Sequence, residues 1–225
     1  MKSLFRSTFI LLLSFNLVSC FEITEDITIH SDGNGILKIQ ADFSESKFKI
    51  NSILEHQEYE GYQIPSRDKI KSTFNQLVNL TDFCSNISIV SSDIDLENYI
   101  INYSCKFNEV EDVNVLVDSI KTEFNSDLNP KFKYLKYDRK KGEFSRNGDN
   151  FLKDKVEQLP LSQRVIFNSA YYTCIYRFDN LIDSNFTSGA KTSTNRKIST
   201  KKLSMKSLTF NGELINHKIQ TIPVH

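Results

Sequence analysis

The sequence predicts an α+β fold in which antiparallel β-hairpins alternate with helices packed on one sheet face. Segments that alternate apolar and polar residues occur as adjacent pairs, and a period of two is typical of half-buried strands. Between these pairs, apolar residues recur at helical spacing. Strands that follow each other directly in the chain favour antiparallel pairing over a doubly wound parallel sheet.

The first predicted hairpin occupies residues 21–43. Residues 21–29 and 37–43 each place apolar side chains on one face and polar side chains on the other. The Ser-Asp-Gly-Asn-Gly segment at 31–35 is typical of the turn that joins two such strands. After this hairpin, a short helical stretch is predicted from Ser44 to Leu54.

Two amphipathic helices flank a second hairpin, which spans residues 86–107 and turns near residues 95–98. Ser66 is the expected N-cap of the first helix. Asn108 is the expected N-cap of the second, with Glu111 at the capping-box position. The apolar stripes of the two helices are Ile70, Phe74, Leu77 and Val78, and then Val110, Val113, Leu116, Val117, Ile120 and Phe124.

The rest of the chain predicts mainly strands. We expect residues 20–225 to form one α+β domain, with a subdomain boundary near 126–131 as an alternative. The remaining predicted elements are a hairpin at 131–138 and 142–146, a brief helix from Asp149 to before Pro160, and strands at 164–178, 202–208 and 214–222.

Residues 1–19 are predicted to be a lipoprotein signal peptide. Two cations precede an apolar run of roughly ten to twelve residues, too short for a transmembrane helix of about 20 residues. The run ends in Leu-Val-Ser-Cys at 17–20, which resembles the lipobox of bacterial lipoproteins. This resemblance implies cleavage before Cys20, attachment of a diacylglyceryl group with acyl chains such as palmitate to its thiol, and tethering to a membrane. The alternative is ordinary secretory cleavage before Phe21.

Several segments resemble an uncharacterised family of Bacteroidota lipoproteins. They are Phe-Glu-Ile-Thr-Glu at 21–25, the turn at 31–35, Tyr-Gln-Ile-Pro-Ser at 62–66 and Tyr-Ser-Cys-Lys-Phe at 103–107. The resemblance covers most of the mature chain, but it implies only a cellular location and a fold, and no activity. Because Cys20 is not followed by aspartate, nothing resembles an inner-membrane retention signal. We therefore expect a cell-envelope protein anchored in the outer membrane and facing the periplasm.

Composition and motifs argue against several functions. Two of the 28 basic residues lie in the signal, so the mature chain has 26 basic and 28 acidic residues and a net charge of −2. Nucleic-acid binding is therefore not expected. No two histidines lie three or four positions apart, and no Cys-x-x-Cys or Gly-x-Ser-x-Gly motif occurs. We therefore predict no catalytic residue, no metal site and no cofactor, and a protein that is not an enzyme.

Two other features have two interpretations each. Cys105 and Cys174 fall on the apolar faces of their strands, so they are either buried free thiols or a disulfide. A cation-rich stretch near the C-terminus is either an anion-facing patch or the solvated side of an edge strand. Its cations are Lys191, Arg196, Lys197, Lys201, Lys202 and Lys206.

With no chemistry evident, the leading hypothesis is a lipid-anchored interaction module that binds an unknown envelope protein. The alternative is a carrier or sensor that binds an apolar ligand between the helices and the sheet. A continuous apolar cavity of roughly 300 Å³ or more would favour the carrier.

Overall fold

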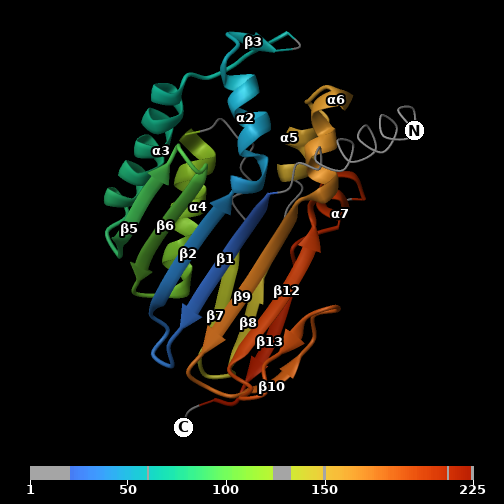
Figure 1. The fold of residues 1–225 in the computed structure, drawn as a ribbon. Helices are drawn as coiled ribbons and strands as arrows, with labels where there is room; N and C mark the ends of the chain where they lie inside the picture. The colour runs from blue at the N-terminus through green and yellow to red at the C-terminus, as the bar shows by residue number, and fades with distance from the viewer. Residues whose placement is uncertain (1–20, 60, 124–132, 149–150, 212, 224–225) are drawn as a thin grey trace, which may run out of the picture.

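The computed structural model describes residues 21–59, 61–123, 133–148, 151–211 and 213–223, and the chain has an α+β architecture (Figure 1). Its main element is a seven-stranded sheet. The strands of this sheet, in spatial order, are β11 (Lys191–Thr192), β12 (Ile198–Ser204), β9 (Tyr171–Phe178), β1 (Glu22–Ile29), β2 (Gly35–Asp42), β6 (Ile100–Phe107) and β5 (Ile87–Asp95).

A smaller sheet packs against one half of the larger one. Phe144 in the smaller sheet contacts Tyr176 and Phe178 of β9, with ring centroids 4.9 and 5.5 Å apart. A separate two-stranded ribbon, β3 (Glu58–Tyr59) and β4 (Tyr62–Gln63), projects beyond the sheets. The smaller sheet has the order β10 (Ile182–Asn185), β13 (His217–Thr221), β8 (Glu143–Arg146) and β7 (Leu135–Asp138).

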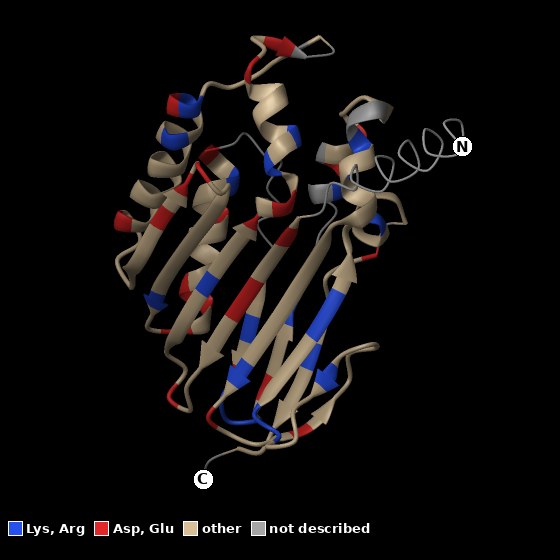
Figure 2. Cartoon of the chain, in the orientation of Figure 1, with Lys and Arg blue, Asp and Glu red and all other residues tan. Residues whose placement is uncertain are grey.

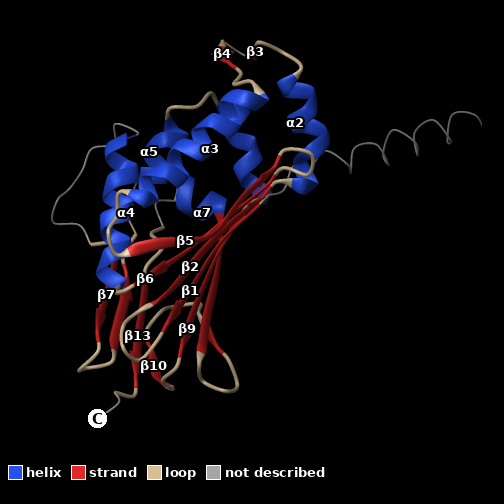
Figure 3. Ribbon diagram, turned by 90° about the vertical axis from the view of Figure 1, so that its left-hand side faces the viewer, coloured by secondary structure: helices blue, strands red, loops and turns tan. Residues whose placement is uncertain are grey.

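Helices cover the other half of the same sheet face (Figure 3). Helices α3 (Arg67–Asp82) and α4 (Val110–Glu123) lie behind β2, β6 and β5 in the view of Figure 1, and the smaller sheet lies behind β1, β9 and β12. The shorter helices gather where β1 begins. They are η2 (Ser44–Ser46), α2 (Lys47–Leu54), α5 (Phe151–Glu157), α6 (Leu161–Arg164), η3 (Val165–Ser169) and α7 (Met205–Phe210).

Several local predictions are confirmed by hydrogen bonds. The Ser66 side chain caps α3 by accepting a bond from the backbone N–H of Lys69, at 3.1 Å. The β1–β2 hairpin is antiparallel and in register from Glu22–Asp42 to Ile29–Gly35. At Gly35 a Cβ would lie 2.0 Å from the carbonyl oxygen of Thr28, so only glycine fits this end of the hairpin.

One long-range pairing differs from the prediction. Strands β1 and β9 are parallel, from Glu22–Tyr171 to Ile29–Phe178, so the large sheet is mixed. It also contains strands from both sides of the predicted 126–131 boundary. Residues 126–131 themselves lie outside the described residues.

Two predicted strands and one predicted helix cap differ from the structure. The predicted strand 164–178 is helical in its first half, where α6 and η3 lead into β9. The predicted strand 202–208 becomes α7 after Ser204, because the Ser204 side chain accepts a bond from the N–H of Ser207 and caps a helix. At the start of α4, the capping carboxylate is that of Asp112, which accepts a bond from the backbone N–H of Glu109, and not that of Glu111.

Candidate functional site: an apolar cavity beside a buried polar cluster

An apolar cavity of about 510 Å³ lies between α3, α4 and the sheet. It exists because α3 and α4 turn their apolar stripes toward β2, β6 and β5 without filling the space between them. Many of the lining side chains are therefore only half-buried, as Ile70, Leu77 and Ile101 illustrate. The apolar lining comprises Leu37, Ile39, Pro65, Ile70, Phe74, Leu77, Val78, Ile94, Ile101, Leu116, Val117 and Ile120.

The polar groups in the cavity wall are few, and most are already bonded. The hydroxyls of Thr81 and Tyr103 bond to each other at 2.8 Å. The hydroxyl of Tyr134 donates to the carboxylate of Glu25, away from the cavity. Lys69 is exposed, and it is the one charged residue among those that line the cavity in the described part of the chain. The wall therefore offers apolar contact over nearly all of its area.

A smaller hollow of about 190 Å³ continues the apolar lining toward α2. It shares Ile70, Ile94 and Ile101 with the larger cavity, and it adds Phe43 and Ile50. The shared side chains make the two spaces neighbours along one face of the sheet. Two apolar spaces therefore lie side by side between α4 and α2.

A polar cluster is buried beside the cavity, between the two sheets. Glu25 of β1 has no exposed surface, and its carboxylate accepts bonds from Tyr172 at 2.7 Å and Tyr176 at 2.6 Å as well as from Tyr134. The guanidinium of Arg146, in β8, lies 3.3 Å from the same carboxylate. It stacks over the ring of Tyr134 at 4.5 Å. Glu25 and Arg146 thus join the two sheets through an ion pair with three hydroxyl donors.

The electrostatics of the cluster keep Glu25 ionised. Burial alone would raise the pKa of Glu25, but the charge of Arg146 and the three tyrosine hydroxyls lower it below its usual range. Burial and the nearby Glu25 carboxylate raise the pKa values of Tyr172 and Tyr176, so both stay protonated as donors. With its oxygens occupied and no exposed surface, Glu25 is placed to hold the sheets together and not to act on a ligand.

A second polar contact lies farther along the same interface. The Nε2 of His217 is 2.7 Å from the hydroxyl of Ser199, which also accepts a bond from the side-chain amide of Asn185. Burial and the nearby Lys201 lower the pKa of His217 to about 4, so the ring is neutral at pH 7. Both side chains are buried, which argues for a structural role.

Of the two interpretations of Cys105 and Cys174, the structure shows the free thiols and not the disulfide. Cys105 and Cys174 are buried free thiols on β6 and β9, as is Cys84 after α3. Strands β1 and β2 lie between β6 and β9, so three strand spacings of about 4.8 Å separate the two cysteines. A disulfide requires Cα atoms within about 7 Å, which this sheet order excludes.

The six cations of the possible anion-facing patch are distributed over β11, the turn after it, β12 and α7, where Figure 2 colours the basic residues blue. Lys201 is buried, and its ammonium lies 3.5 Å from Glu213. Lys202 faces the other side of the sheet and lies 3.1 Å from Glu22. Cys20, the predicted lipidation site, lies outside the described residues. The other cations, Lys191, Arg196, Lys197 and Lys206, are exposed, with Arg196 3.9 Å from Asp183.

Sequence reasoning missed Glu25, although a signal was present. Glu25 has the same parity along its strand as Ile23, Ile27 and Ile29, so the alternation itself directs it inward. An acid at an inward position needs a buried partner, and nothing local identifies Arg146 in that role.

Within the ranges that the structure describes, no group of three or more His, Cys, Asp or Glu side chains could hold a metal ion. No helix in the same part of the chain is long and apolar enough to cross a bilayer.

Comparisons with known proteins give a fold similarity alone. No protein-family model matches the chain, and no curated protein matches it. Among solved structures, the fold is similar to the folded domain of LppM from Mycobacterium tuberculosis, determined by NMR. The two share 12% sequence identity and a TM-score of 0.46, and the similarity covers 91% of each chain. At this identity and score, the similarity carries no argument about function.

Proposed function

We propose that this protein is a lipid-anchored, non-enzymatic cell-envelope protein that binds a ligand with a long apolar chain between α3, α4 and the large sheet. The proposal includes an anchor at Cys20, placement in the outer membrane facing the periplasm, and membership of the Bacteroidota lipoprotein family that the sequence resembles. The observation that carries the binding function is the apolar cavity of about 510 Å³.

The size of the cavity supports an occupant. Ligand pockets in proteins range from about 300 to 1,000 Å³. Many of the apolar side chains that line the cavity are only half-buried, so an apolar ligand would remove from water surface that the fold leaves partly exposed.

The chemistry of the wall supports an acyl chain as the part that is bound. Each methylene that leaves water contributes about 0.8 kcal/mol, which is close to a fourfold change in Kd. We expect affinity to rise by about this factor per methylene in a series of fatty acids. It should then level off once the cavity is full.

Two valines on α4 provide a matched test. Val117 lines the cavity, whereas Val115 is exposed on the opposite side of the same helix. In a titration with a fluorescent fatty acid, without vesicles, Val117→Trp should weaken binding by at least about tenfold, because the indole displaces several methylenes. Val115→Trp should bind like the parent. Equal binding by both variants, or affinity that does not depend on chain length, would overturn the proposal.

Protein–protein interaction, the other function expected from the sequence, would use the sheet face that α3, α4 and the smaller sheet leave uncovered. Two ion pairs lie on that face. Arg177 binds Asp26 through two nitrogens at 2.9 Å, and Lys202 pairs with Glu22. Charges that already bind each other contribute little to the binding of a partner, so the cavity is the stronger candidate.

A further inference from the structure

The chain enters the fold at a buried residue. Phe21, the residue after Cys20, is 5% exposed. Its ring stacks on Phe43 with centroids 5.0 Å apart and meets Phe167 edge-on at 5.7 Å. Its carbonyl oxygen accepts a bond from the N–H of Tyr171, at 3.0 Å. The residue next to the proposed lipid attachment point is therefore already fixed in the core.

The short helices cluster at the end of the sheet where Phe21 lies (Figure 1). Glu22 pairs with Asp42 and with Tyr171, and Ser204 pairs with Tyr171 as well. Helix α2 follows the strand that ends at Asp42, α6 and η3 precede the strand that begins at Tyr171, and α7 follows Ser204. These helices thus surround the point where the chain enters.

These helices expose large apolar side chains. Phe48 of α2 is 88% exposed and Leu161 of α6 is 77% exposed. Val165 of η3 and Phe210 of α7 are also exposed. Lys47 and Lys49 flank Phe48 in the sequence, an arrangement that lets an aromatic ring enter a bilayer while the ammonium groups stay at the headgroups.

We propose that this end of the domain, with Phe48, Leu161 and Val165 at its surface, is a membrane-docking surface. The inference rests on the lipid anchor in the proposed function. Consecutive Cα atoms are only about 3.8 Å apart, so an acylated Cys20 leaves no spacer between the bilayer and Phe21. The surface around Phe21 must then lie against lipid, and its exposed apolar side chains insert there.

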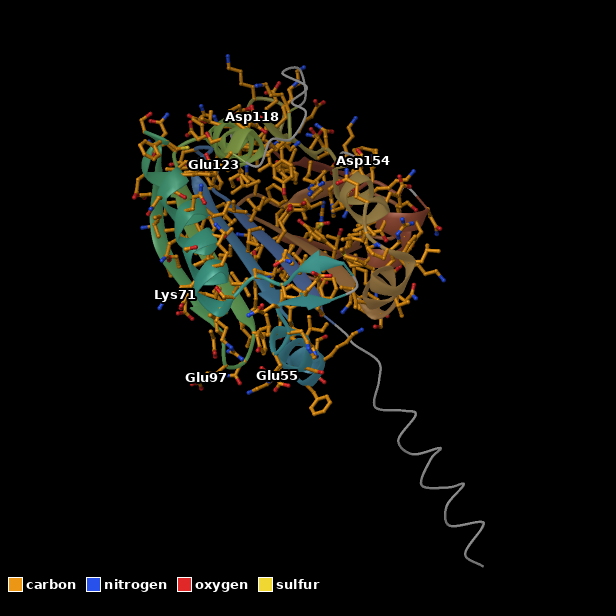
Figure 4. The ribbon with its side chains drawn as sticks, turned by 90° about the horizontal axis from the view of Figure 1, so that it is seen from above. Glu55, Lys71, Glu97, Asp118, Glu123 and Asp154 are labelled. Atoms are coloured by element: carbon orange, nitrogen blue, oxygen red, sulfur yellow. The ribbon has the colours of Figure 1, made fainter. Side chains whose placement is uncertain are left out.

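Charge at this end is mixed, so apolar insertion dominates the docking. Seen from above, Glu55, Lys71 and Glu97 lie along the side formed by α2 and α3, and Asp154 lies on the side of α5 (Figure 4). Acidic residues are repelled by anionic headgroups, and the nearby lysines offset this repulsion. Docking is therefore expected to change little with salt concentration, unlike binding by a basic patch.

Docking also orients the cavity. Phe21 stacks on Phe43, and Phe43 lines the smaller hollow that continues the main cavity. The α2 end of the apolar site therefore faces the bilayer when the domain docks. An acyl chain could pass between membrane and site without crossing open water.

The absence of tryptophan from the sequence allows a direct test with single reporters. The lipidated, full mature protein is placed in vesicles that contain brominated phospholipids, with either Phe48→Trp or Phe83→Trp. Phe83 is the matched control, because it is 85% exposed but lies at the opposite end of the sheet from Phe21. It precedes Ile87 by four residues, and Ile87 is in the row of paired residues that ends at Ile29, the last residue of β1. Both sites are exposed, so neither change should disturb folding.

The Phe48→Trp variant should show blue-shifted emission that the brominated lipid quenches, with little change between low and high salt. The Phe83→Trp variant should keep the emission of a residue in water. Solvent-like emission from both variants, or equal quenching of both, overturns the docking surface. Fatty-acid binding without vesicles is measured separately, so loss of docking with retained binding refutes only this inference.

Discussion

Replacing Glu25 with glutamine removes the negative charge from the space between the two sheets and leaves Arg146 buried without its counter-ion. Arg146 is 5% exposed, and the distance from its guanidinium to the Glu25 carboxylate is 3.3 Å. Removing one partner of such a pair costs about 3–5 kcal/mol, because the remaining charge stays desolvated. For a domain of about 200 residues, each kcal/mol lowers Tm by about 2–4 °C. The expected fall in Tm is thus about 6–20 °C.

The assay is thermal and urea unfolding of the mature protein, followed by far-UV circular dichroism. Glu22→Gln is the control on the same strand, since Glu22 makes an exposed pair with Lys202 and its loss should cost less than about 1 kcal/mol. The double variant Glu25→Gln with Arg146→Leu should recover part of the lost stability, because no unpaired charge remains. If Glu25→Gln costs no more than Glu22→Gln, the cluster does not hold the sheets together.

The same pair predicts how stability changes with pH. The folded pKa of Glu25 is lower than the value of about 4.3 that it has in an unfolded chain. The ionised form therefore stabilises the fold fully above about pH 4.3, and this contribution is lost as the pH falls through the folded pKa. The difference in stability between the parent and Glu25→Gln should narrow on acidification. A constant difference from pH 7 to pH 3 would contradict this reasoning.

Three further outcomes are expected. Asn114→Ala should destabilise the protein by about 2–4 kcal/mol, measured by urea unfolding, because the buried amide bonds both the N–H and the carbonyl of Leu135 and ties α4 to β7. Cys105 and Cys174 should resist alkylation in the native protein and react in urea, since both are buried and burial raises the pKa of Cys174 to about 12. If they did not react in urea, the two cysteines would be joined in a disulfide after all. Cys20→Ala should move the protein out of the detergent phase on phase separation, and unchanged partitioning would exclude the anchor.

Local elements were predictable where the chain itself carries the signal. The turn at 31–35 and the alternation on either side of it specify the first hairpin, and Ser66 with the stripe behind it specifies α3. The parallel pairing of β1 with β9 has no such signal. Asp26 and Arg177, which bond across it, are 151 positions apart, and neighbouring residues do not encode a pairing at that distance.

The cavity could not be predicted for a different reason. An apolar stripe with the period of a helix looks the same whether its side chains touch the sheet or stand away from it. The stripes of α3 and α4 were identified correctly, apart from Phe124, which lies outside the described residues, but Leu77 and Val117 line a space and do not fill it. The distance between helix and sheet depends on side chains from many elements, so it emerges only from the assembled fold.

The buried cluster and the cavity share Tyr134, and this makes the walls of the site unequal. On one side, Tyr134 is fixed by its bond to Glu25 and by the stacked guanidinium of Arg146, so the wall next to the smaller sheet is rigid. On the other side, Ile70, Leu77 and Val78 of α3 are half-buried and face the cavity. Fewer packed contacts mean a lower cost for local displacement. Adjustment to a ligand should therefore occur through movement of α3, while the two sheets keep their positions relative to each other.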